Sequence, residues 1–234
     1  MKKLKPINML DTRMIRPERA AVVDAIQELA VLGRIPQSLP VNDFGHYRDH
    51  HWLDKSGRLR PHLSVDWYVA NAWDAKRKMV NGSVLMRSLA EEPWRREEIF
   101  GDHYDLLILD EELLAEEGLE EAESAVSVSQ HLIGTIISAS ALDRLNYDMY
   151  ALLKTAALHG FGHAFGLPDL RRDDIDFTHG LHCRNRCVMR HAPADAEAWQ
   201  KLTEDRLVCG PLCERCVQDL RRFFAEGDAA LPRE

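Results

Sequence analysis

The sequence is most informative between Asn146 and Gly166, where it reads NYDMYALLKTAALHGFGHAFG. Apolar residues recur here at the spacing of one helical face, and Gly166 is placed to end the helix in a left-handed cap. His159 and His163 stand four residues apart, so both imidazoles project from the same side, as a two-ligand metal platform requires. Histidines at this spacing also occur in ordinary cores and surfaces, so the pair predicts a metal only together with the residues that follow.

Candidates for a third ligand lie just beyond this helix. Gly166 lets the chain reverse sharply, so that a following residue can return to a metal held by the two histidines. Asp169 stands three residues after this glycine and is the ligand that the spacing favours. His182 and His179 remain the alternatives.

All five cysteines lie in the 34 residues from Cys183 to Cys216, directly after the histidine-rich stretch. Cys183 and Cys187 form one close pair, and Cys213 and Cys216 form another. Two such pairs can each hold one edge of a tetrahedron, so we predict a structural zinc site with four cysteine ligands. The alternative is a set of buried free cysteines. Cys209 is the spare cysteine, which we expect in a loop.

These motifs resemble a known peptidase family. The stretch 159–169 is similar to the HExxHxxGxxH/D signature of the metzincin zinc peptidases, with the aspartate in the position found in snapalysins. His182-Cys183, Cys187, a Cys-x-Met ending at Met189 and the final CxxC resemble the archaemetzincin pattern. The resemblance covers roughly residues 104–220, and the first hundred residues carry nothing recognisable.

The resemblance implies a fold, two zinc ions per chain and a reaction. The expected fold is an α+β fold, a twisted mixed sheet with packed helices, a zinc cleft and a small C-terminal lobe held by the cysteine zinc site. The expected reaction is hydrolysis of peptide bonds by zinc-activated water, with a peptide or protein as the partner. Met189 would be the methionine whose turn lies beneath the catalytic-type zinc.

Two departures from the family bear on function. Gly160 stands where the signature has its general-base glutamate, a group worth roughly 10²–10⁴-fold in rate, so we expect weakened hydrolysis. Fourteen residues, 168–181, also separate features that the family places almost side by side. Nothing in the sequence selects a substitute carboxylate among four candidates, which are Asp173, Asp174, Asp176 and Glu111. The alternatives are a non-catalytic module that keeps the peptide cleft, and a protein in which only the cysteine site binds zinc.

Composition narrows the function classes. The chain has 234 residues, 30 basic against 38 acidic side chains and a net charge of −8. Nucleic-acid and anionic-membrane proteins need a positive surface, so we expect neither partner. The apolar runs fall far short of the roughly 20 residues of a membrane span, and no secretory signal is visible. We therefore expect a cytoplasmic protein of unknown oligomeric state.

Residues 1–234 are expected to form one domain, with an N-terminal lobe over about 12–166 and a C-terminal lobe over about 167–234. We predict an irregular arm over 1–16, helices over 17–32, 88–100, 146–166 and 213–226, and strands over 62–69, 104–110, 125–130 and 132–138. Residues 34–61 read as loop with at most a short strand, and 111–123 as an acidic, solvated segment.

Overall fold

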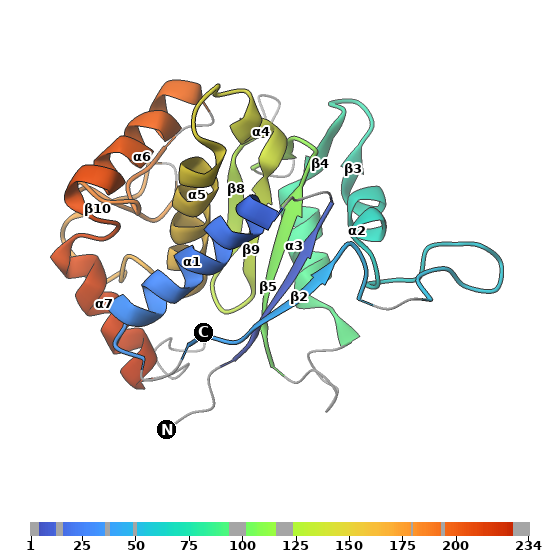
Figure 1. The fold of residues 1–234 in the computed structure, drawn as a ribbon, viewed down its shortest axis with the longest axis horizontal. Helices are drawn as coiled ribbons and strands as arrows, with labels where there is room; N and C mark the ends of the chain where they lie inside the picture. Colours follow the sequence, from blue (N-terminus) through green and yellow to red (C-terminus); the bar gives the residue numbers. More distant parts are fainter. Residues whose placement is uncertain are drawn as a thin grey trace.

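The structure, a computed structural model, is built around a five-stranded sheet (Figure 1). It describes residues 5–12, 16–35, 38–48, 51–93, 102–115, 124–178, 180–192 and 195–226. The sheet has the order β2-β1-β5-β9-β8 and consists of β1 (Ile7–Asp11), β2 (Val41–Gly45), β5 (Tyr104–Leu109), β8 (Ser127–Gln130) and β9 (Gly134–Ser138). Its first four strands pair in parallel, whereas β8 runs antiparallel to β9 at the edge.

Helices cover both faces of this sheet. One face carries α1 (Arg16–Leu32), α5 (Met149–Ala164) and α7 (Glu214–Glu226), with α6 (Ala196–Cys209) packed on α5, and the other carries α2 (Val65–Ala72) and α3 (Gly82–Ala90). The short α4 (Ala139–Asp143) follows β9. Strand β5 shows why both faces need cover: Leu106 and Ile108 enter the first core, while Leu107 and Leu109 enter the second. A strand buried on both sides reads as a continuous apolar run.

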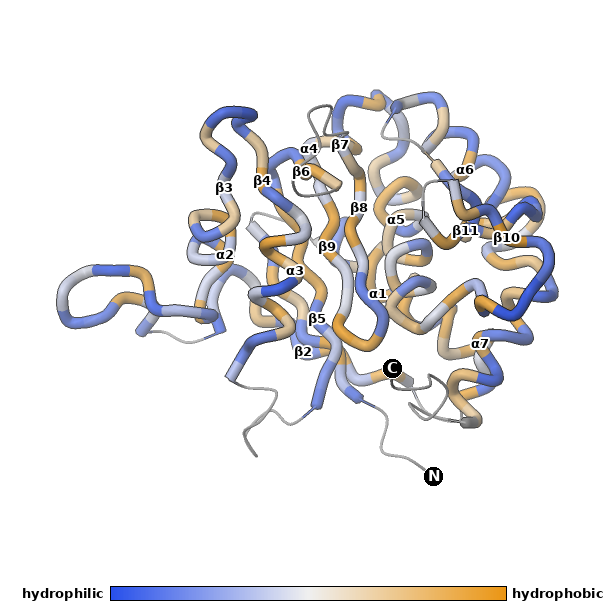
Figure 2. Tube along the Cα trace, turned by 180° about the vertical axis from the view of Figure 1, so that it is seen from behind, coloured by the Kyte–Doolittle hydropathy of each residue, from blue (hydrophilic) through white to orange (hydrophobic). Residues whose placement is uncertain are grey.

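Smaller strands complete the fold. A four-stranded sheet in the order β3-β4-β6-β7 contains β3 (Trp73–Asp74), β4 (Met79–Asn81), β6 (Leu113–Leu114) and β7 (Ser124–Ala125). A separate ribbon pairs β10 (Ile175–Asp176) with β11 (His182–Cys183). The loop 51–61 projects from the body as a largely hydrophilic arm (Figure 2). None of the helices in the described part of the chain combines the length and apolar character needed to cross a bilayer.

Several sequence predictions are confirmed. The mixed α+β architecture is present, the strand predicted over 104–110 is β5, and the helix predicted over 17–32 is α1. The histidine helix is α5, and the strands predicted over 125–130 and 132–138 appear as β7, β8 and β9. The first core contains residues from Ile7 in β1 to Leu220 in α7. The division into two lobes stays a prediction.

Other predictions were wrong. The N-terminal segment is no arm beyond residue 6, because Ile7–Asp11 is fully buried as β1 between β2 and β5. The strand predicted over 62–69 is largely the helix α2, which begins after Ser64, whose hydroxyl accepts from the Trp67 backbone N–H. The helix predicted over 88–100 is α3, which starts at Gly82 and ends at Ala90; residues 94–100 lie outside the described residues. Helix α6 was not predicted at all.

Candidate metal centres

Helix α5 brings His159 and His163 together. The helix begins after Asp148, whose carboxylate accepts from the Tyr150 backbone N–H, and it is buried between α1, the sheet and α6. One helical turn separates the two histidines, and their Nε2 atoms lie 3.2 Å apart. Two imidazole ligands of a tetrahedral zinc, each bonded at about 2.0–2.1 Å, would be about 3.3–3.4 Å apart.

The third imidazole comes from β11. His182 lies against both other rings, with centroids 5.5 Å from His159 and 5.0 Å from His163. One nitrogen from each of the three residues falls within 4.8 Å of the other two. His191 packs on the outer side of His182, at 4.9 Å between ring centroids. Three converging imidazoles are the donor set of a catalytic-type zinc site, which keeps a fourth position for water or substrate.

The protonation state of the three imidazoles suits metal binding. The Nδ1–H of His159 donates to the backbone oxygen of Val188 at 2.6 Å, so its Nε2 faces His163. Burial lowers the pKa of His159 to about 4, and burial with repulsion from His159 and His191 lowers the pKa of His182 to about 3. The pKa of His163 is also well below its ordinary value, chiefly through burial. All three rings are therefore neutral at pH 7, the form that binds a metal.

Asp169, the ligand that the spacing favoured, is not a member of this group. Its carboxylate binds the guanidinium groups of Arg171 and Arg222, the latter at 2.7 Å, and its backbone N–H donates to Asp219. The hydrogen bonds from Arg171 hold the pKa of Asp169 far below its usual range. The structure thus brings His182 to the α5 histidines and turns Asp169 away. His179 lies outside the described residues.

Gly160 sits at a close approach between α5 and the sheet. A Cβ atom at this position would lie 2.2 Å from Thr135 Oγ1 and 3.2 Å from Ser129 Oγ. Ser129 in β8 and Thr135 in β9 hydrogen-bond to each other at 2.9 Å, so the two hydroxyls fill the space that a side chain at 160 would need. Glycine is the residue that fits, and the position has no room for a glutamate while Thr135 is present.

Met189 packs against the same helix. It is fully buried, and a Cβ atom at Gly162 would lie 2.2 Å from its sulfur. Gly162 therefore leaves room for the methionine between the positions of His159 and His163. A role for the turn at Met189 beneath a metal stays a prediction.

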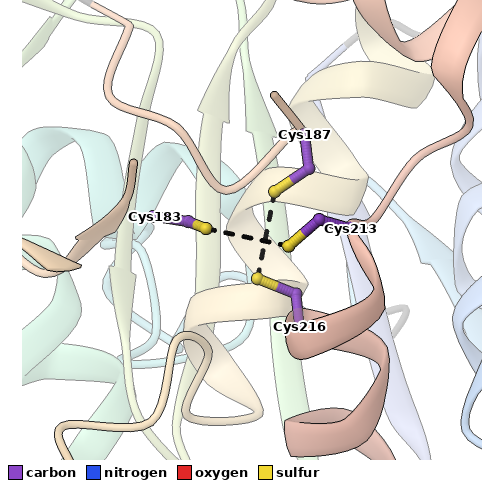
Figure 3. Close-up of side chains that lie close together, drawn as sticks. All are labelled: Cys183, Cys187, Cys213 and Cys216. Atoms are coloured by element: carbon purple, nitrogen blue, oxygen red, sulfur yellow. Dashed lines mark hydrogen bonds between the residues drawn. The ribbon is translucent and has the colours of Figure 1, made fainter. Parts of the chain in front are cut away.

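Four cysteines converge in a second group, shown in Figure 3. Cys183 Sγ lies 3.8 Å from Cys213 Sγ, and Cys187 Sγ lies 3.9 Å from Cys216 Sγ. These separations exclude disulfides, whose sulfurs are about 2.05 Å apart. They match the edge of about 3.8 Å expected for a tetrahedron of sulfurs each about 2.3 Å from zinc. Cys209 is exposed at the end of α6 and is not a member of the group.

Hydrogen-bond donors surround these sulfurs. The Arg172 guanidinium donates to Cys216 Sγ at 3.1 Å and to Cys183 Sγ at 3.2 Å. Asn185 donates its backbone N–H to Cys183 Sγ and its side-chain amide to Cys213 Sγ. Donors aimed at sulfur stabilise thiolates, which are the form that binds zinc.

Sequence reasoning missed four residues of these sites, because only the folded chain brings them there: Arg172, Asn185, Ser129 and Thr135. The one available signal was Gly160 itself, since a glycine in a helix interior indicates a close approach.

Comparison with known proteins agrees with this fold. No family model matches the chain, and no curated protein matches it in sequence. Among solved structures, the archaemetzincin of Methanopyrus kandleri superposes with a TM-score of 0.57 over 94% of this chain and 96% of that chain, at 16% sequence identity. The chain shares its fold with an archaemetzincin. At this identity the likeness concerns the fold, and the roles of individual residues rest on the geometry above.

Proposed function

We propose that this chain is a zinc-dependent peptide-binding protein with a metallopeptidase-like fold, in which hydrolysis is largely lost. His159, His163 and His182 would hold one zinc, and the four clustered cysteines would hold a structural zinc. A bound zinc supplies Lewis-acid chemistry, polarising a carbonyl oxygen and acidifying water. Burial keeps the three imidazoles neutral, and the backbone oxygen of Val188 orients His159.

The packing at Gly160 is the observation that argues against efficient hydrolysis. In a zinc peptidase a carboxylate beside the first histidine takes a proton from water and passes it to the leaving amine. Here the hydroxyls of Thr135 and Ser129 occupy that side-chain position. A hydroxyl is too weak a base near neutral pH to take this role, so the position that holds the general base in a zinc peptidase provides none here.

Strand β8 supports the peptide-binding part of the proposal. It lies at the edge of the five-stranded sheet, is half-buried, and packs beside α5. An extended peptide can add to such an edge through backbone hydrogen bonds, with side-chain pockets providing selectivity. A peptide on β8 would then lie next to the helix that carries His159 and His163.

A peptide library resolved by mass spectrometry tests the function. Zinc-loaded protein is incubated with the library, and retained and newly cut peptides are identified beside a His163→Ala control. We expect the wild type to retain peptides uncut and the control to lose this retention. Absence of retention in the wild type would overturn the proposal.

A second candidate is a peptidase that uses Asp176. Of the carboxylates considered from the sequence, Asp173 and Asp174 bind Arg215, and Asp174 also binds Arg172. Asp176 instead pairs with His182 across the β10–β11 ribbon, so the two side chains share one face. Cleavage by the wild type that Asp176→Asn abolishes, with zinc content unchanged, would favour this candidate over binding alone.

A further inference from the structure

A third group of potential ligands lies on the opposite face of the sheet from the histidine site. Glu92 follows α3, His103 precedes β5, and Asp105 lies in β5 on the face that packs against α2 and α3. The side chains of all three residues are fully buried. One atom from each falls within 4.8 Å of the other two.

The distances inside this group fit metal ligands. His103 Nε2 lies 3.3 Å from Glu92 Oε2 and 3.4 Å from Asp105 Oδ2. An N–H···O hydrogen bond is ordinarily about 2.9–3.0 Å long. Nitrogen and oxygen ligands at about 2.0–2.1 Å from a tetrahedral zinc would be about 3.3–3.4 Å apart.

The remaining carboxylate oxygens are held from outside. Arg48 Nη2 donates to Glu92 Oε1 at 2.7 Å and to Asp105 Oδ1 at 2.8 Å, and the hydroxyl of Tyr68 donates to Glu92 Oε1. One oxygen of each carboxylate is thereby fixed by a donor, while the other faces His103. Ligating carboxylates in metal sites are characteristically hydrogen-bonded in this way.

The charges of this cluster allow two arrangements, one with a cation and one without. With a neutral His103, two carboxylates and one guanidinium sum to −1, and a divalent cation would bring the sum to +1. His62 also lies near the cluster and interacts electrostatically with Arg48 and Asp105. A competing arrangement, an imidazolium at His103, would make the sum zero.

We propose that Glu92 Oε2, His103 Nε2 and Asp105 Oδ2 bind a divalent cation of the zinc type, separate from the two centres described above. One imidazole and two carboxylates form a donor set suited to zinc. The ion would join the end of α3 to the start of β5, and Arg48 and Tyr68 would tie the loop after β2 and helix α2 to the same point. Because the ligands are fully buried, its role is structural.

X-ray diffraction from crystals of the unaltered protein grown with zinc tests this site. Anomalous difference maps are calculated from data collected on both sides of the zinc absorption edge. We expect a peak between Glu92, His103 and Asp105 in addition to the peak among the cysteines. A map with the cysteine peak and no peak at the third group would overturn the proposal and identify His103 as part of a metal-free ion cluster.

Metal content provides the second measurement. We expect Asp105→Asn and Glu92→Gln to contain one zinc fewer per folded chain than the wild type. Asp102→Asn is the matched control, because its carboxylate is exposed and pairs only with Lys5 among the ion pairs described. An unchanged zinc content in a folded Asp105→Asn protein would contradict the proposal, and the diffraction result decides if neither variant folds.

Discussion

At the scale of single residues, Gly160 links packing to function. Alanine is favoured over glycine by about 1 kcal/mol in a helix interior, yet its Cβ would lie 2.2 Å from Thr135 Oγ1. We expect Gly160→Ala to lower the free energy of unfolding by about 1–3 kcal/mol, measured in urea, because overpacking outweighs propensity. The exposed α6 substitution Lys201→Ala serves as the control, and a stability equal to or above wild type would contradict the close approach.

The same contact determines how a carboxylate can be restored. Gly160→Glu alone should be destabilised and inactive, whereas Gly160→Glu combined with Thr135→Gly has room for the side chain. We expect only the double variant to cut the peptides that the wild type retains, with a gain of about 10²–10⁴-fold over Thr135→Gly alone. Equal activity of the double variant and Thr135→Gly would mean that the histidine site does not act on peptides.

Arg172 makes a prediction at the cysteine site. Its guanidinium donates to two sulfurs, which stabilises their thiolate forms, and it also pairs with Asp174 and Asp219. We expect Arg172→Gln to weaken zinc retention by about 10–100-fold in competition with a chromogenic chelator. Arg184→Gln, which alters an exposed side chain next to Cys183, should retain zinc as the wild type does.

At the scale of elements, the sequence predicted those whose periodicity is unambiguous. The double-sided apolar run of β5 and the long apolar face of α5 are strong local patterns, and both elements form as predicted. The cysteine pairs were also predictable, because each lies within four residues along the chain. His182 needed tertiary information, since β10 and β11 must pair before it reaches α5.

The elements that were missed have local signals that conflict with their surroundings. Ile7–Asp11 is a short apolar run among basic residues, and only pairing on both sides makes it a central strand. Trp67, Tyr68 and Val69 favour strands by propensity, but the cap at Ser64 and packing against α3 make them helical. Tertiary contacts therefore outweighed local preference in both cases.

The cysteine group should hold α7 to the rest of the protein. Cys213 precedes α7 and Cys216 lies in its first turn, while their partners come from β11 and the turn after it. Removal of zinc by a strong chelator should therefore increase amide hydrogen exchange over 213–226 and 182–187, measured by mass spectrometry. Exchange in β5 and β9 should change little, and uniform loosening of the whole chain would contradict this local role.

At the scale of the whole molecule, β11 connects the two candidate metal centres. His182 belongs to the histidine group and Cys183 to the cysteine group, and neighbouring residues of a strand point to opposite sides. Zinc at the cysteine group would therefore fix the strand that presents the third histidine. Under the proposed function, the cysteine site would thus help to position the histidine site.

Because the histidines are buried in their neutral form, we expect the chelated protein to lose stability in acid. The unfolded chain has histidines of pKa about 6.5, whereas burial lowers His159 to about 4 and His182 to about 3 in the folded protein. The unfolded state thus binds more protons below pH 6.5, so the free energy of unfolding should fall as the pH drops from 6.5 toward 4. For His159 alone this loss is on the order of 3 kcal/mol. Urea unfolding across this range, beside a chelated His159→Ala variant, measures it; an equal pH slope in both proteins would contradict the burial of His159 as a neutral ring.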